Sequence, residues 1–423
     1  MNHREFSRPE LMGVLGALVC VAQELPKAAP PDENKELMQA LQESGTSSID
    51  ILRTLESFLK KYPNTAQRPQ LERALARASV DLKDDERIVR YGEAALANAP
   101  DDMLLIDRVA RSLLTIGGRD NAEKSLKYSR MFEQNIRKAP PPDGRDAGRK
   151  QEDRDRALSR ALVYQARAEE ILDQNAEAEK LASEAFSVYP CEEAARQWSE
   201  ALERLHREKD AVLKLADAFA VPDAHAAETD RAADRRHLGE LYRKAHHNEK
   251  GLGDVILEAY DRTAVLVEEH RKRLEAMDPN LAANDPMQFT IPGLDGKKLT
   301  LSSLKGSVVI LDFWATWCQP CRAQHPLYDQ VKQRFKDRRD VVFLAIDTDE
   351  DRNLVAPFLQ QQNWSTQSVY FDDGLQRLLQ VSSIPTTVLF DKQGRVASRM
   401  NGFLPDKFVD QLTERIRSAL DSQ

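Results

Sequence analysis

The sequence has few cysteines, few aromatic residues and no hydrophobic run of the roughly 20 residues that a membrane-spanning helix needs. Four cysteines in 423 residues are too few to hold a secreted scaffold together by disulfides, so the core must form by hydrophobic packing. Aromatic residues make up 6% and charged residues 31%, which favours helices over a large sheet. The net charge of −8 arises from mixed charges without a basic stripe, so we expect no nucleic-acid partner. The length predicts two or three domains.

The N-terminus has the pattern of an export segment. Arg4 and Arg8 precede an apolar stretch at 11–22 that ends in small residues. Residues 1–22 are therefore predicted to be a signal peptide or a short membrane anchor, and the protein is expected outside the cytoplasm, in the periplasm if the cell is Gram-negative. Cys20 raises the alternative of a lipoprotein, but the bulky Val19 argues against it. Residues 23–32, rich in proline, are predicted to be a flexible linker.

Between residues 33 and 277 every periodic segment has helical spacing. The predicted helices end at residue–proline pairs that begin at Tyr62, Ala99, Ala139 and Tyr189. The first three lie about 37 to 40 residues apart, close to the length of a helix–turn–helix repeat. The pattern resembles degenerate tetratricopeptide (TPR) repeats, which stack into a solenoid and can recruit a partner protein. An irregular helical bundle is the alternative.

This region also contains a predicted loop, one cysteine and several histidines. We predict that 140–148, with the charged run after it, forms an inserted loop. Cys191 follows a proline at a helix start and is expected to be an inert thiol, with a second redox thiol as the alternative. The histidines at 237, 246, 247 and 270 are expected to be solvated or packed rather than metal ligands.

The C-terminal part alternates between strand and helix patterns, after a linker at 278–285 that ends the last long helix. This order predicts an α/β domain at 286–423. The expected strands are a hairpin at 289–291 and 299–301, then 308–313, 341–346, 369–371, 387–390 and 396–400. The expected helices are 318–335, 354–363, 375–379 and 405–420.

The segment 308–321 carries the clearest chemistry. An apolar strand leads to a turn, then to Cys318 and Cys321 at the start of a helix. The helix dipole and unpaired backbone N–H groups favour a thiolate at Cys318, and Cys321 lies one turn further on, where it can resolve a mixed disulfide. A structural zinc site is the alternative for such a pair, but there is no second cysteine pair and His325 stands alone.

With Trp-Ala-Thr-Trp before the first cysteine and Gln-Pro between the two, this segment resembles the extracytoplasmic TlpA/ResA-like branch of thioredoxin-fold oxidoreductases. The resemblance covers residues from about 286 to the C-terminus. It implies that Cys318 is the nucleophile and Cys321 the resolving thiol, that Cys318 is the nearer to solvent, and that Pro385 forms a cis peptide bond beside them. It also implies that substrate is contacted by the following residues: Trp317, Gln319, Pro320, Ile384 and Thr386.

Asp312 lies on the strand six residues before Cys318. A carboxyl group in this apolar setting should have a raised pKa and could accept the proton of Cys321. A purely structural, hydrogen-bonded acid is the alternative. The wider thioredoxin family carries an Asp at this position, whereas many TlpA-like members do not. The lysine that often partners this Asp in thioredoxin is not found here, because the strand at 341–346 is wholly apolar.

We therefore predict a multidomain protein: an all-α, TPR-like helical repeat followed by an α/β thioredoxin fold. Its expected function is protein-disulfide reduction outside the cytoplasm. We expect the helices to hold a partner protein. A separate thiol electron donor, which could be embedded in the membrane, is expected to reduce the cysteine pair. No cofactor or metal is expected. The alternatives are net disulfide oxidation, a binding scaffold whose thioredoxin module senses redox state, and peroxide reduction.

Overall fold

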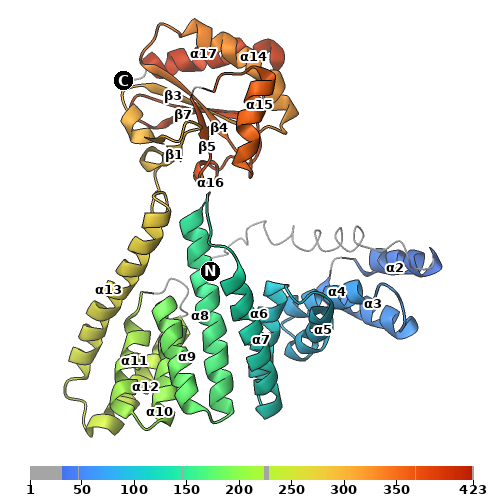
Figure 1. Ribbon diagram of the computed structural model, residues 1–423, viewed down its shortest axis with the longest axis vertical. Coiled ribbons are helices and arrows are strands. Elements are labelled where there is room, and N and C mark those ends of the chain that lie inside the picture. The colour runs from blue at the N-terminus through green and yellow to red at the C-terminus, as the bar shows by residue number, and fades with distance from the viewer. Residues whose placement is uncertain (1–30, 46, 145, 223–227, 367, 422–423) are drawn as a thin grey trace, which may run out of the picture. The chain divides into compact units, whose positions relative to one another are not determined.

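The computed structural model describes residues 31–421, except 46, 145, 223–227 and 367 (Figure 1). The predicted export segment at 1–22 and most of the linker at 23–32 lie outside these residues. Contacts divide the chain into two compact units: residues up to 140 with 153–270, and residues 141–152 with those from 271 onward. None of the described helices is both long and apolar enough to cross a bilayer.

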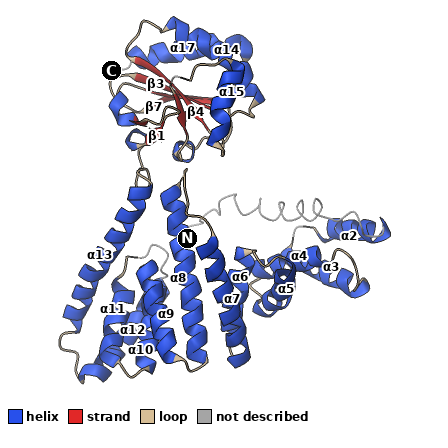
Figure 2. Cartoon of the chain, viewed as in Figure 1, coloured by secondary structure: helices blue, strands red, loops and turns tan. Residues whose placement is uncertain are grey.

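The described residues of 31–277 form helices and contain no strand (Figure 2). Most of these helices lie in the first unit, but residues 147–152 and 271–277, at the ends of two of them, belong to the second. The helices are α2 (Pro31–Ser44), α3 (Ser48–Lys61), α4 (Arg68–Asp81), α5 (Asp85–Asn98), α6 (Met103–Ile116), α7 (Arg119–Lys138), α8 (Ala147–Ile171), α9 (Asn175–Val188), α10 (Glu192–Arg204), α11 (Glu208–Ala220), α12 (Glu228–His246) and α13 (Leu252–Met277). Helix α2 begins at Pro31, so the last two residues of the expected linker are helical.

The residue–proline pairs end helices as predicted. Helices α3, α5, α7 and α9 each stop one residue before such a pair, with Tyr62, Ala99, Ala139 and Tyr189 as C-caps. A proline clashes with the preceding turn and disfavours helical geometry at the residue before it. The prediction of a loop is wrong from residue 147 onward, because α8 begins at Ala147 and includes the charged run. That run is rich in Arg, Glu, Gln and Lys, which have high helix propensity and need no apolar periodicity to be helical.

Neighbouring helices pack in pairs, and the same contact recurs between successive pairs. The hydroxyl of Tyr91 donates to Glu56 at 2.7 Å, and the hydroxyl of Tyr128 donates to Glu93 at 3.3 Å. Both bonds join residues 35 positions apart. A recurrent spacing of this kind is what an array of similar helical units produces.

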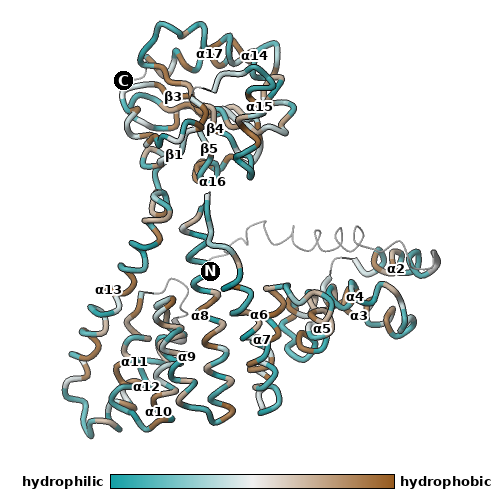
Figure 3. The backbone as a smooth tube through the Cα atoms, in the orientation of Figure 1, coloured by the Kyte–Doolittle hydropathy of each residue, from teal (hydrophilic) through white to brown (hydrophobic). Residues whose placement is uncertain are grey.

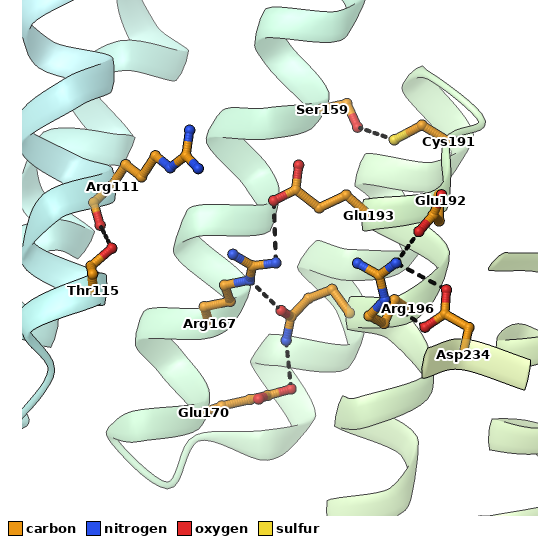
Figure 4. A network of polar contacts seen from close by, with 11 residues as sticks. Arg111, Thr115, Ser159, Arg167, Glu170, Cys191, Glu192, Glu193, Arg196 and Asp234 are labelled. Atoms are coloured by element: carbon orange, nitrogen blue, oxygen red, sulfur yellow. Dashed lines mark hydrogen bonds and ion pairs between the residues drawn. The ribbon is translucent and has the colours of Figure 1, made fainter. Parts of the chain in front are cut away.

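Polar contacts also tie α8, α10 and α12 together (Figure 4). Arg167 of α8 donates to Gln197 of α10 at 2.9 Å, and Gln197 donates in turn to Glu170 at 2.8 Å. Arg196 of α10 makes two hydrogen bonds to Asp234 of α12, at 2.7 and 2.9 Å. Asp234 is buried, so this ion pair fixes which face of α12 points into the unit.

The second unit contains a five-stranded sheet in the order β5-β4-β3-β6-β7. Strands β3 and β4 and strands β4 and β5 are parallel, whereas β6 is antiparallel to both β3 and β7. Its strands are β3 (Val308–Trp314), β4 (Val341–Asp347), β5 (Val369–Phe371), β6 (Thr386–Phe390) and β7 (Val396–Asn401), and a separate hairpin joins β1 (Thr290–Pro292) to β2 (Lys298–Thr300). The helices are α14 (Gln319–Arg334), α15 (Val355–Gln362), α16 (Leu375–Leu378) and α17 (Pro405–Asp421), with 3₁₀ turns η1 (Pro286–Gln288), η2 (Leu301–Leu304) and η3 (Arg352–Leu354).

Alternate residues of β3 face two different cores, and Figure 3 shows the central strands as hydrophobic. Val308 and Ile310 pack with residues of α14 and α17, whereas Val309 and Leu311 pack with the β1–β2 hairpin and α16. A strand covered on both faces must be apolar on both, which explains its continuous hydrophobic run. The thioredoxin fold predicted for this part of the chain is confirmed.

Candidate active site

The two cysteines lie where β3 passes into α14. Cys318 is the N-cap residue of α14, and the backbone N–H of Cys321 points at its sulfur, 3.2 Å away. Pro320 stands in the first turn, where its missing N–H leaves no gap in the helix. Cys318 and Cys321 are joined by a disulfide, so the structure represents the oxidised state. The pair can therefore be opened by an incoming thiolate and reformed by exchange.

Both cysteines are buried, which differs from the expectation that Cys318 lies nearer to solvent. Cys318 is 3% exposed and Cys321 is 6% exposed. They pack in a small apolar cluster with Trp314, Val355 and Leu359. Helix α15 supplies two of these side chains, a tertiary contact that the spacing of the cysteines does not reveal. Gln319 and Pro320, between the cysteines, are both exposed.

A second loop reaches the same edge of the sheet. The Ile384–Pro385 peptide bond is cis, as the family resemblance implied. Ile384 packs against the apolar cluster that contains the cysteines. Gly402 donates its backbone N–H to the carbonyl oxygen of Pro385 at 2.7 Å, and its φ of +68° is in the left-handed region that favours glycine. Thr386 begins β6 and bonds through its hydroxyl to the carbonyl of Ser383 at 2.7 Å.

Asp312 has polar neighbours inside the domain. Its Oδ1 lies 3.2 Å from the side-chain amide nitrogen of Gln324 and 3.4 Å from the hydroxyl of Thr387. Burial raises the pKa of Asp312 to about 7, and the positive charge of Lys332 and the two hydrogen bonds offset this only in part. The raised pKa agrees with the sequence-based expectation. The opposing lysine comes from α14, whereas the family pattern would place it on β4.

Asp349 is part of the site although the sequence analysis did not select it. Its carboxylate accepts two hydrogen bonds from Thr316, from the backbone N–H at 2.7 Å and from the hydroxyl at 2.9 Å. Arg322 of α14 holds the same residue from the other side by donating to the carbonyl oxygen of Thr316. Asp349 and Arg322 thus clamp the turn that leads into Cys318. The partners lie 33 positions apart in the chain, so no local spacing reveals the contact.

Aromatic side chains surround one flank of the cysteines, and one stands out into solvent. Trp314, Phe358 and Trp364 have ring centroids 5.5 to 5.9 Å apart, and His325 stacks on Trp364 at 3.7 Å. Trp317, directly before Cys318, is 68% exposed. Tryptophan is one of the side chains that contribute most to binding at protein–protein interfaces.

Among the residues that the structure describes, the remaining candidates do not form a metal site. Within the described residues no group of three or more His, Cys, Asp or Glu side chains could hold a metal ion. Cys191 is half-buried at the N-cap of α10, with its sulfur 4.0 Å from the hydroxyl of Ser159. His270 is buried and lies 3.0 Å from Asp155, while His237 is exposed and lies 2.7 Å from Glu203.

The fold and the site together define a thioredoxin-fold thiol-disulfide oxidoreductase domain. A thioredoxin-like family model matches residues 306–396. The chain is 32% identical over 131 residues to the thiol-disulfide oxidoreductase ResA of Bacillus thuringiensis subsp. konkukian, covering 30% of this chain and 73% of that protein. It is 34% identical over 116 residues to ResA of Bacillus cereus (strain ZK / E33L), covering 27% of this chain and 66% of that protein.

Through this domain the chain belongs to the ResA family of thiol-disulfide oxidoreductases. Among solved structures it is similar to a putative thiol:disulfide interchange protein DsbE from Chlorobium tepidum, with 34% identity, 32% of this chain and 96% of that chain covered, and a TM-score of 0.29. The residues that the family model matches lie in the C-terminal domain, and each relative named here covers about a third of this chain or less.

Proposed function

We propose that the Cys318–Cys321 pair reduces disulfides of partner proteins outside the cytoplasm. The observation that carries this proposal is the pair at the N-terminus of α14, beside the cis-proline loop and an exposed tryptophan. As a ResA-type oxidoreductase the protein acts on disulfide-containing substrates. The direction of the exchange and its location outside the cytoplasm are the parts that we propose.

The reaction begins with the reduced pair. The Cys318 thiolate, favoured by the N-terminus of α14 and by the N–H of Cys321, attacks one sulfur of the substrate disulfide. The substrate S–S bond breaks, its other sulfur leaves and takes a proton, and a mixed disulfide forms on Cys318. Cys321, as a thiolate, then attacks the Cys318 sulfur and releases the second substrate thiol. The substrate gains two electrons and two protons, and a thiol donor must reduce the pair again.

Three groups of neighbouring residues have proposed supporting roles. Asp312, with its raised pKa, accepts the proton of Cys321 during resolution. The backbone around Pro385, between Ile384 and Thr386, pairs with the substrate chain. Side chains at the rim of the site contact the substrate around the attacked sulfur: Trp317, Gln319 and Pro320.

The equilibrium reduction potential of the pair tests the direction. Titration against dithiothreitol or glutathione should give about −250 mV or lower if the protein is a reductase, since thioredoxin has about −270 mV. A value near about −120 mV would make it an oxidant and overturn the proposal. The Cys318→Ser variant should lose reduction of a disulfide substrate, whereas Cys191→Ser should retain it and serves as the matched control.

The helical region is proposed to recruit the partner protein as a TPR-like array. The recurrent Tyr–Glu contacts and the paired helices support this assignment. A partner trapped as a mixed disulfide on a Cys321→Ser variant should also bind, without a covalent bond, to a Cys318→Ser/Cys321→Ser variant in calorimetry. Absence of that binding would count against recruitment by the helices and leave the exchange reaction untouched.

Export is the third part of the proposal. Residues 1–22 act as a signal peptide or a short anchor, residues 23–30 and 278–285 act as linkers, and the protein works in the periplasm if the cell is Gram-negative. Mass spectrometry of the protein purified from cell fractions tests this. Loss of the first 22 residues supports cleavage, their retention in the membrane fraction supports anchoring, and a cytoplasmic protein would contradict both.

A further inference from the structure

Helix α12 has one face rich in arginine that the exchange reaction does not use. A pocket of about 750 Å³ opens on this face. Four arginines line it: Arg231, Arg235, Arg236 and Arg243. Glu240 is the one acidic residue in its lining. The pocket therefore carries a local positive charge in a chain whose net charge is −8.

The shape of the pocket follows from the spacing along α12. Arg231, Arg235 and Arg243 stand on one ridge of the helix, and the remaining position of that ridge is Gly239. Glycine leaves a gap in the row of side chains, and Ala232 leaves another on the neighbouring ridge. The ring of Phe219, from α11, adds an apolar wall. The row of arginines extends over about 18 Å, at 1.5 Å of rise per residue.

The orientation of α12 keeps this face available. Asp234, on another face, is buried and bound to Arg196 of α10 (Figure 4). Leu238 and Leu241 are also buried. These contacts hold α12 against α10 and α11, so the arginine-lined face points away from the hydrophobic core of the unit.

The basic residues of α12 differ in whether a carboxylate pairs with them. In the pocket lining, Arg231 lies 3.9 Å from Glu192 and Arg243 lies 2.8 Å from Glu249. Outside the pocket, His237 lies 2.7 Å from Glu203 and Lys244 lies 3.3 Å from Glu208. Inside it, Arg235 and Arg236 are exposed, and neither has a hydrogen bond or ion pair with any residue of the described chain. Two neighbouring guanidinium groups without a carboxylate repel each other, and an anion from outside would relieve this repulsion.

We infer that this pocket binds an acidic segment of a partner protein, one that carries several carboxylates with an apolar side chain between them. Guanidinium groups bind carboxylates through paired, charge-assisted hydrogen bonds. The two unpaired guanidinium groups, those of Arg235 and Arg236, suit a ligand with more than one carboxylate, and Phe219 with the gaps at Gly239 and Ala232 suits an apolar side chain. The overall negative charge of the protein disfavours nucleic acid. This inference rests on the proposed recruitment of partners by the helical region.

Fluorescence anisotropy with the full-length protein tests the inference. The probe is a fluorescein-labelled peptide in which glutamates alternate with leucines, and its control is the same peptide with glutamine in place of glutamate. The acidic peptide should bind at low ionic strength and weaken as salt is added, and the glutamine peptide should not bind. Arg235→Glu/Arg236→Glu should weaken the acidic peptide by about tenfold or more, because charge-assisted hydrogen bonds become repulsive contacts.

A matched variant controls for charge. Arg77→Glu/Lys209→Glu reverses two exposed charges outside the pocket and should leave the peptide affinity unchanged. Equal binding by the Arg235→Glu/Arg236→Glu variant would overturn the inference. So would displacement of the peptide by inorganic phosphate at equal concentration, or tighter binding of phosphatidylserine vesicles or single-stranded DNA. Circular dichroism should show the same melting curve for all variants, and a lower melting temperature would call for Arg235→Gln/Arg236→Gln instead, with the same expected loss of affinity.

Disulfide reduction of a small substrate separates this inference from the proposed reaction. It should be unchanged in Arg235→Glu/Arg236→Glu, because the pocket lies in the helical unit and takes no part in thiol exchange. A protein that binds the peptide but fails to reduce disulfides would refute the reductase and leave the pocket standing. A protein that reduces disulfides but does not bind the peptide would refute the pocket alone.

Discussion

Replacing Asp312 with asparagine should stabilise the second unit, and the gain should depend on pH. Burial raises the pKa of Asp312 from 3.8 to about 7. Between these values the folded protein holds the proton while the unfolded chain has lost it, so stability falls as pH rises through this window. A shift of roughly 3 pKa units corresponds to about 4 kcal/mol at 1.36 kcal/mol each, which is an upper limit because the side chain is only partly buried.

The asparagine variant isolates the charge. Asn retains an oxygen that can accept the hydrogen bonds from Gln324 and Thr387 but does not ionise. The gain in stability should therefore be near zero at about pH 4 and approach its maximum at about pH 8. The variant should also resolve mixed disulfides more slowly, because the proposed acceptor for the Cys321 proton is gone.

Urea denaturation of the oxidised protein, followed by tryptophan fluorescence, measures this. A Trp198→Phe background leaves Trp314, Trp317 and Trp364, all of which lie in the second unit. The same gain at both pH values, or none at either, would refute the reasoning. Lys332→Met is an independent check: removing this positive charge should move the pH window upward, since Lys332 lowers the pKa of Asp312.

Three further predictions concern other contacts. Asp349→Ala should slow disulfide exchange and destabilise the second unit by about 1 to 3 kcal/mol, because two hydrogen bonds to Thr316 are lost; stopped-flow kinetics and urea denaturation measure the two effects. Glu170→Gln should stabilise the first unit at about pH 8 by up to about 3 kcal/mol but not at about pH 5, since burial raises the pKa of Glu170 to about 7; thermal melts at both pH values check this. Trp317→Ala should raise the KM for a protein substrate and leave the reduction potential unchanged, as steady-state kinetics and a redox titration would show.

The sequence predicted the second unit well because its signals are local. The apolar run of β3 and the cysteine spacing at the start of α14 mark their elements to within one residue at each end. Proline after Tyr62 and after Tyr189 likewise ended α3 and α9 where expected. In each case the physical cause acts within a few residues of the chain, where it can be seen without a structure.

The site was predicted less completely because its remaining parts depend on distant contacts. Asp349 binds Thr316, which lies 33 residues away in the chain. Lys332, whose charge lowers the pKa of Asp312, belongs to α14, and nothing in the sequence of β3 indicates this neighbour. The burial of Cys318 is also tertiary, since α15 supplies part of the apolar cover. The spacing of two cysteines can be read from a sequence. The burial of their sulfur atoms cannot, because it depends on residues of α15 that pack on them only in the folded protein.

Strand direction explains why these distant parts meet. Strands β3 and β4 are parallel, so their carboxyl ends lie at one edge of the sheet and bring Thr316 next to Asp349. Strand β6 is antiparallel to β3, so it begins at that same edge and sets Thr386 opposite Phe313. The loop that carries Pro385 immediately precedes β6 and therefore has to lie beside the turn into Cys318. A change that weakens the β3–β6 pairing should thus disturb the loop that carries Pro385 before it disturbs the disulfide, which is held by α14 and covered by α15.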